Sequence, residues 1–243
     1  MMEKLYDACD IQRVADQYLE IRERLETACA KAGRAPSEVT LIGVTKTVDP
    51  VLINAALDAG LSAIGENRVQ EYLGKRQDLH LDGVERHLIG HLQTNKVKMI
   101  VGEVDMIQSV DSLRLATEID RISAQKGLVT PVLVEVNIGE EESKDGIALA
   151  QSEELIRQMA LLKHISVRGM MTIPPISDTE AKKRYYFSKM RDLFIDIRSK
   201  NIDNIFMHIL SMGMSDDFEL AVAEGSTMVR VGTAMFGKRN YSV

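Results

Sequence analysis

The sequence predicts a single (β/α)8 barrel of the TIM type with an extra N-terminal helix. Strand-like and helix-like patterns alternate about eight times along the chain, and several strand-like runs, such as residues 131–136, are apolar almost throughout. The length of 243 residues suits one barrel. No linker-like segment divides the chain, so we expect one domain over residues 1–243. A doubly wound open sheet would show the same alternation and stays open as the alternative.

The first elements have clear boundary signals. Apolar residues recur at helical spacing over residues 10–33, and Gly33 is a typical residue for a helix end. Residues 39–45 then form a short β-rich run. The pair Asp49-Pro50 follows, and it predicts a helix with an aspartate N-cap and proline in the first helical position.

The rest of the chain continues the alternation. We expect further strands near residues 61–65, 86–90, 105–110, 131–138, 165–172, 205–210 and 228–232. Helices are expected between most of them, for example over residues 111–126, 149–162 and 179–200. In a barrel of this kind, functional side chains lie at the carboxyl ends of the strands.

Composition narrows the class of protein. Hydrophobic residues make up 45% and charged residues 27%, as in ordinary soluble proteins. The two cysteines, Cys9 and Cys29, indicate reduced thiols in a cytoplasmic protein. The net charge of −6 argues against a nucleic-acid-binding protein. The absence of a long apolar run argues against a membrane span, and the absence of a signal peptide pattern argues against secretion. No apolar stripe suggests an interface, so we expect a monomer.

Lys46 is the first candidate for chemistry, because it follows the first predicted strand directly. Period-two alternation puts Ile42, Val44 and Lys46 on one face. If that face lines the barrel, the amine lies at the mouth above apolar side chains, where desolvation favours the neutral, nucleophilic form. Such a lysine can form a Schiff base. The simpler interpretation is a lysine at a strand end that reaches solvent.

The last strand contains an arginine between two valines. If Val229 and Val231 pack against helices, Arg230 enters the barrel, where an unpaired guanidinium is very costly. Arg230 must therefore meet built-in acceptors inside the barrel.

Two loops are suited to a phosphate group. Gly232-Thr233 follows the last strand, and the loop beginning Ser211-Met212-Gly213-Met214-Ser215 follows the strand before it. Barrels often bind phosphate with these two loops, through backbone N–H groups and hydroxyls. Each loop by itself also fits ordinary turn and cap chemistry. Their occurrence at both expected positions favours phosphate binding.

Two further polar residues lie near predicted strand ends. Asn67 can hydrogen-bond a ligand or cap a helix, and His87 can contact a ring or be a buried structural histidine. His87 and His91 are four residues apart, but the segment between them is strand-like. We expect no metal site there.

These candidates fall within longer motifs spread over nearly the whole chain. The motifs are Val44-Thr45-Lys46-Thr47, Gly65-Glu66-Asn67-Arg68-Val69-Gln70-Glu71, His87-Leu88-Ile89-Gly90-His91-Leu92-Gln93-Thr94-Asn95-Lys96, Val136-Asn137-Ile138-Gly139, Arg168-Gly169-Met170-Met171-Thr172-Ile173, Leu210-Ser211-Met212-Gly213-Met214-Ser215, Gly225-Ser226-Thr227 and Val229-Arg230-Val231-Gly232-Thr233. Together they resemble the YggS/PROSC family of pyridoxal 5'-phosphate (PLP) homeostasis proteins. The barrel also resembles the N-terminal domain of alanine racemase.

The resemblance implies PLP as cofactor and a role for each candidate residue. It implies that Lys46 forms the Schiff base with PLP. It implies that Ser215, Gly232 and Thr233 hold the phosphate, with Ser211 as a further contact. It also implies that Arg230 faces the pyridine nitrogen, that Asn67 lies beside the ring and that His87 belongs to the same site.

The resemblance further implies a non-catalytic protein that buffers or delivers PLP and maintains vitamin B6 and amino-acid pools, with PLP-dependent apoenzymes as partners. The chain ends soon after Arg230, so we expect no second domain with the tyrosine base of alanine racemase. One alternative is a PLP-dependent racemase or lyase for small amino acids, with His87, Tyr72 or a partner's residue as base. A Schiff-base aldolase without PLP is a third hypothesis.

Overall fold

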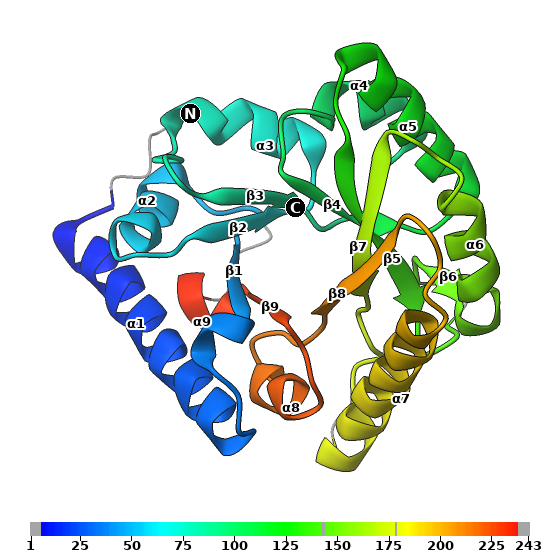
Figure 1. The fold of residues 1–243 in the computed structure, drawn as a ribbon. Helices are drawn as coiled ribbons and strands as arrows, with labels where there is room; N and C mark the ends of the chain where they lie inside the picture. The colour runs from blue at the N-terminus through cyan, green and yellow to red at the C-terminus, as the bar shows by residue number, and fades with distance from the viewer. Residues whose placement is uncertain (1–5, 142–143, 178, 238–243) are drawn as a thin grey trace.

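Eight parallel strands close into a barrel in the computed structural model, which describes residues 6–141, 144–177 and 179–237 (Figure 1). Their order around the ring is β4-β3-β2-β1-β9-β8-β7-β5, and pairing of β4 with β5 closes it. This closure confirms the predicted TIM-type barrel and excludes the open doubly wound sheet. The strands are β1 (Thr40–Val44), β2 (Ala63–Glu66), β3 (Glu85–Leu88), β4 (Met106–Val110), β5 (Thr130–Asn137), β7 (Ile165–Met171), β8 (Ile205–Ser211) and β9 (Met228–Val231).

Helices surround the ring of strands. They are α1 (Ala8–Lys31), α2 (Pro50–Asp58), α3 (Val69–Lys75), α4 (Val97–Ile100), α5 (Leu113–Lys126), α6 (Ser152–Met159), α7 (Glu180–Ser199), α8 (Phe218–Ala223) and α9 (Thr233–Phe236). The predicted extra helix is α1, which packs on the outside against α2, α8 and α9 (Figure 1). The sequence patterns did not predict β6 (Ile147–Ala148), a two-residue strand that pairs with β5.

The alternation of side chains separates an inner from an outer core. Ile42 of β1 is fully buried and packs with Ala63 and Met228 inside the barrel. Its neighbour Leu41 packs outward, in the cluster that includes α1 and α2. Lys46 therefore follows a strand whose residue Ile42 points inward, which is the orientation that the interpretation of Lys46 required.

Local signals explain the boundaries of the first helices. The side chain of Asp49 accepts a hydrogen bond of 3.0 Å from the N–H of Val51, and Pro50 begins α2, as predicted. Gly33, just after α1, has a φ of 67°, a conformation that glycine adopts without steric cost.

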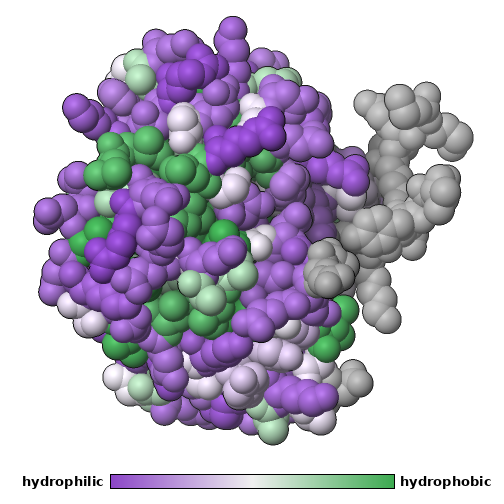
Figure 2. All heavy atoms as spheres, turned by 90° about the vertical axis from the view of Figure 1, so that its right-hand side faces the viewer, coloured by the Kyte–Doolittle hydropathy of each residue, from purple (hydrophilic) through white to green (hydrophobic). Residues whose placement is uncertain are grey.

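The surface in Figure 2 is mostly hydrophilic, with hydrophobic side chains gathered in separate patches. Within the described residues, no helix is both long and apolar enough to cross a membrane.

Candidate functional site

Five predicted site residues lie at the carboxyl end of the barrel. Lys46 follows β1 by two residues, and Asn67 follows β2 directly. Gly232 and Thr233 follow β9, and Ser215 lies in the loop after β8. Because β8, β9, β1 and β2 are successive neighbours, the barrel brings these residues to one sector of its mouth.

The two loops predicted to hold phosphate are joined by hydrogen bonds. The hydroxyl oxygen of Ser215 accepts from the N–H of Gly232 at 3.3 Å and from the N–H of Ala234 at 3.2 Å. The side chain of Thr233 is exposed beside these groups. The result is a cluster of backbone N–H groups and hydroxyls, which we call the N–H/hydroxyl cradle (Ser215, Gly232, Thr233 and Ala234).

Arg230 lies inside the barrel, with its side chain among neutral acceptors. Its Nη1 donates to Oγ of Ser211 at 2.6 Å, and its Nη2 donates to the carbonyl of Thr172 at 2.8 Å. Burial lowers the pKa of Arg230 to about 10, while the charges of Glu135 and Asp217 oppose this shift. The guanidinium therefore stays charged at neutral pH and has the built-in acceptors that the sequence predicts.

A chain of hydrogen bonds, here called the interior chain, continues from Arg230 down the barrel. Ser211 donates to Oε1 of Gln108 at 2.8 Å, and Nε2 of Gln108 donates to Nδ1 of His87 at 3.0 Å. Since Nδ1 accepts, Nε2 of His87 carries the proton and faces Oε2 of Glu85 at 3.2 Å. Every member from Arg230 to Glu85 thus donates to the next.

His87 and Ser211 belong, with Arg230, to the interior chain and not to the group of five predicted residues at the mouth. His87 lines a cavity of about 600 Å³ together with Thr40, Glu85 and Met106, which are the first residues of their strands. This cavity lies at the opposite end of the barrel from Lys46. The hydroxyl of Ser211 is fully buried and already bonded to Arg230 and Gln108.

Two groups at the mouth have no partner among the described residues. The side-chain oxygen Oδ1 of Asn67 is buried without a hydrogen bond. The half-buried side chain of Lys46 makes no hydrogen bond or ion pair with a described residue. A buried polar atom without a partner is costly, which makes Oδ1 of Asn67 a candidate acceptor for a hydrogen-bond donor on a ligand.

Glu135 is a buried carboxyl group on the inward face of β5. It is 5% exposed, and no described residue hydrogen-bonds its side chain. Burial raises its pKa to about 8, and the charges of Asp145 and Asp111 add to this, whereas Arg230 opposes it. Glu135 is therefore largely protonated at neutral pH.

His91 lies in a different environment from His87. Its Nδ1 is 3.3 Å from Asp145 and 3.8 Å from Asp111, and the three ligand atoms lie within 4.8 Å of one another. These residue types can hold a divalent cation, and they equally form an ion-pair cluster when the histidine is protonated. The two histidines do not share a site.

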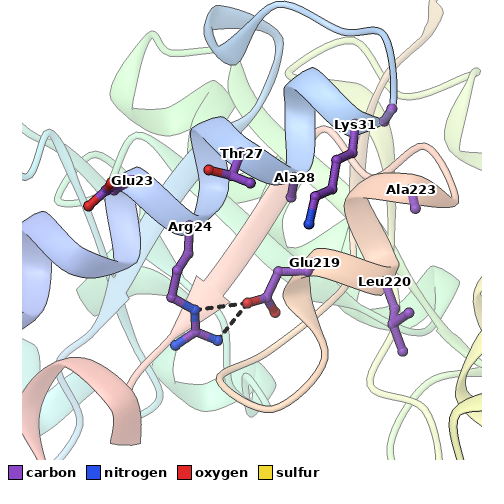
Figure 3. A pocket seen from close by; sticks show the side chains of 9 residues that line it. Glu23, Arg24, Thr27, Ala28, Lys31, Glu219, Leu220 and Ala223 are labelled. Carbon is purple, nitrogen blue, oxygen red and sulfur yellow. Dashed lines mark hydrogen bonds and ion pairs between the residues drawn. The ribbon is translucent and has the colours of Figure 1, made fainter.

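Another hollow, of about 450 Å³, lies outside the barrel between α1 and α8 (Figure 3). Arg24 crosses it and donates to Oε1 of Glu219 at 2.9 and 2.6 Å. Its lining contains none of the predicted site residues.

Sequence reasoning missed several residues that support the site. Gln108 is a buried amide on the inward face of β4, and the available signal was a large polar side chain within a short strand-like run. Thr172 contributes only its carbonyl, which no side-chain pattern reveals. Lys75 lies on α3, nine residues after the end of β2 in sequence, although its Nζ reaches the carbonyl of Thr45 just after β1.

Fold and site define a class: a parallel (β/α)8 barrel whose mouth carries a lysine with no side-chain partner among the described residues. An N–H/hydroxyl cradle lies beside it, after the neighbouring strands β9 and β8. The chain belongs to the alanine racemase N-terminal domain family, which matches residues 19–240. It is 43% identical over 221 residues to the pyridoxal phosphate homeostasis protein of Aquifex aeolicus, covering 91% of this chain and 96% of that protein.

Solved structures agree with this assignment. PipY of Synechococcus elongatus, in a structure with PLP bound, is 36% identical, with a TM-score of 0.78 over 89% of this chain and all of that one. An alanine racemase of Clostridium difficile shares the fold at 15% identity, with a TM-score of 0.72 over 93% of this chain and 58% of that one.

Proposed function

We propose that this protein binds PLP through a Schiff base on Lys46 and buffers or delivers it, maintaining vitamin B6 and amino-acid homeostasis. The observation that carries the proposal is the amine of Lys46, which contacts no partner in the described ranges and lies at the same mouth as the N–H/hydroxyl cradle. One site then offers an amine for an aldehyde and several donors for a phosphate. The relatives named for PLP homeostasis support it.

The residues present fit the cofactor. The cradle supplies N–H groups that Ser215 occupies here, and phosphate oxygens accept from such groups. The unfilled Oδ1 of Asn67 can accept from a donor on the ring substituents. The interior chain holds the guanidinium of Arg230 through Ser211, and this guanidinium can face the pyridine ring of PLP. We assign His87 and Ser211 to the support of Arg230, because their polar atoms are already bonded.

Formation of an imine between Lys46 and PLP needs neither an oxidant nor a reductant. The neutral amine of Lys46 adds to the aldehyde carbon, a C=N bond replaces the C=O bond, and the oxygen leaves as water. The bound cofactor supplies an aldehyde that forms imines reversibly, as storage and delivery require.

Titration with PLP tests this proposal. The wild type should develop the visible absorption of an imine, and Lys46→Ala should lose it while keeping its fold. Lys182→Ala is the matched control, because Lys182 is exposed on α7 and its side chain has no partner among the described residues. The loaded wild type should also reactivate a PLP-dependent apoenzyme. A wild type that shows no absorption change with PLP would refute the proposal.

Two observations favour a carrier over an enzyme. The hydroxyl of Tyr72 donates to the backbone carbonyl of Glu103 at 2.9 Å, and Tyr72 packs in the outer core. His87 is held by Gln108 and Glu85 below Arg230. Neither residue is a free acid or base at the mouth, and two-base racemisation needs such groups on both faces of the cofactor.

We further propose that residues 1–243 act as one PLP-binding domain, as a monomer in the cytoplasm. Apoenzymes that need PLP are the proposed partners.

A further inference from the structure

Lys46 lies in a tight turn whose backbone is strained. The N–H of Val48 donates to the carbonyl of Thr45 at 3.1 Å, so Lys46 and Thr47 are the two central residues of the turn. Thr47 has a φ of 58°, in the left-handed region that a β-branched residue rarely adopts. Other contacts must therefore hold this conformation.

Two side chains of α3 hold the turn on both sides of Lys46. Lys75 donates from Nζ to the carbonyl of Thr45 at 2.8 Å. Glu71 accepts at Oε1 a short hydrogen bond from the N–H of Thr47. The two side chains also pair with each other, at 3.1 Å. The backbone of Lys46 is thus fixed through the residues immediately before and after it.

The pair is anchored to β2 by a buried carboxylate. Glu66 is 1% exposed and lies 2.5 Å from Nζ of Lys75, which is 7% exposed. Glu66 also accepts from the hydroxyl of Thr45 at 3.1 Å and from the N–H of Asn67 at 2.8 Å. Burial raises the pKa of Glu66, and the charge of Lys75 opposes this. The network therefore links the Lys46 turn to Asn67, which follows the neighbouring strand at the mouth.

The two lysines have opposite environments. Nζ of Lys75 contacts three acceptors, on Glu66, Glu71 and Thr45, so this nitrogen is fully engaged by its neighbours. The Lys46 amine has no partner among the described residues. The network leaves the Lys46 side chain free and fixes only its backbone.

We propose that Lys75 and Glu71, anchored by Glu66, are positioning residues that hold the Lys46 turn so that its amine reaches a cofactor bound in the cradle. The inference rests on the proposed function of PLP binding. Reaction rates depend steeply on the placement of the reacting atoms, whereas non-covalent binding through the cradle does not involve the amine.

Two ligands separate positioning from a general structural role. PLP can form an imine with Lys46, whereas pyridoxine 5'-phosphate has an alcohol in place of the aldehyde and binds only non-covalently. Stopped-flow absorbance measures imine formation with PLP, and calorimetry measures Kd for pyridoxine 5'-phosphate. The variants are Lys75→Met, Glu71→Met and Glu71→Gln, with Lys182→Met as the matched control.

Lys75→Met and Glu71→Met should slow imine formation by roughly fivefold or more and change the Kd for pyridoxine 5'-phosphate by less than about twofold. Glu71→Gln keeps an oxygen that accepts from Thr47, so it should be slowed less than Glu71→Met. Should Lys75→Met fail to fold, the two Glu71 variants decide the question, because Glu71 is less buried.

Imine formation within about fivefold of the wild type in Glu71→Met would overturn the inference. Slower imine formation with PLP together with an equally weakened affinity for pyridoxine 5'-phosphate would also overturn it, since that result indicates general damage to the site. If the wild type itself forms no imine, the proposed function fails. If the wild type does so and the variants match it, only the positioning role fails.

Discussion

At the scale of single residues, the partners of a side chain decide its role more than its type does. Lys46 and Lys75 are both associated with the turn after β1. Within the part of the chain that the structure describes, the Lys46 amine has no partner, whereas that of Lys75 contacts Glu66, Glu71 and a carbonyl. The sequence could indicate Lys46, because strand alternation and position at a strand end are visible in it. It could not indicate Lys75, because the contact joins α3 to a loop about 30 residues earlier.

Glu135 gives a prediction of pH dependence at this scale. Its pKa is raised to about 8 by burial and by Asp145 and Asp111, so the folded state keeps a proton that the unfolded chain releases near pH 4 to 5. The native state therefore binds more protons between these values, and this residue lowers stability as the pH rises through that window. Glu135→Gln should remove the effect.

Urea unfolding of wild type and Glu135→Gln at pH 5 and pH 9 measures the change. Relative to wild type, the variant should gain roughly 2–4 kcal/mol in free energy of unfolding between the two pH values. Glu20→Gln is the control, since Glu20 is exposed on α1 without a partner among the described residues, and it should show no such gain. Equal pH dependence in wild type and Glu135→Gln would contradict the prediction.

At the scale of elements, the sequence patterns predicted the strands and the longer helices. They did not predict how deep in the barrel each inward side chain lies. Hydrophobic alternation and the Asp49-Pro50 signal are local, and β1 and α2 follow them. β3 is only four residues long, so His87, its third residue, lies below the mouth. Ser211 is the last residue of β8 and faces inward to Arg230, whereas Ser215, four residues later, reaches the cradle. The point at which β8 ends therefore decides that Ser211 lies inside the barrel and Ser215 at its mouth, and sequence patterns predict strand ends poorly.

The loop between β8 and α8 gives a prediction at this scale. Gly213 has a φ of 95°, and a Cβ there would lie 2.5 Å from Cβ of Ala221. Its carbonyl also accepts from the N–H of Arg230 at 3.0 Å. Gly213→Ala should therefore lower the free energy of unfolding by roughly 2–4 kcal/mol and weaken PLP binding, because the loop that carries Ser215 must move.

Gly74→Ala is the matched control for Gly213→Ala. Gly74 is exposed within α3, and a Cβ there would meet nothing within 4 Å. That substitution should raise stability by roughly 0.5–1 kcal/mol, since alanine favours a helix. Urea unfolding and PLP titration of both variants measure the contrast. A Gly213→Ala variant as stable as the wild type would show that the loop absorbs the methyl group.

At the scale of the whole molecule, the barrel combines a polar mouth with an interior in which hydrogen bonds hold the charged side chain of Arg230. Closure through β4 and β5 is what brings Gln108 opposite Ser211, residues 103 apart in sequence. No local pattern reports that pairing, so the interior chain could not be predicted from the sequence. Tyr72 lies on α3 outside the barrel and His87 lies below Arg230, so neither is free at the mouth.

The proposed placement of Arg230 against the pyridine nitrogen of PLP predicts the absence of efficient carbanion chemistry. Arg230 keeps its charge at neutral pH, since its pKa is about 10, and a guanidinium does not transfer its proton to the pyridine nitrogen of PLP. With L-alanine in D2O, the loaded protein should therefore exchange the α-proton no faster than free PLP at the same concentration, as measured by proton NMR. Lys46→Ala is the control, because it removes the amine while leaving Arg230 in place. Exchange that requires Lys46 and exceeds about one turnover per second would establish an enzyme instead. The base would then have to come from a group other than Tyr72 or His87, since the fold holds both away from the mouth.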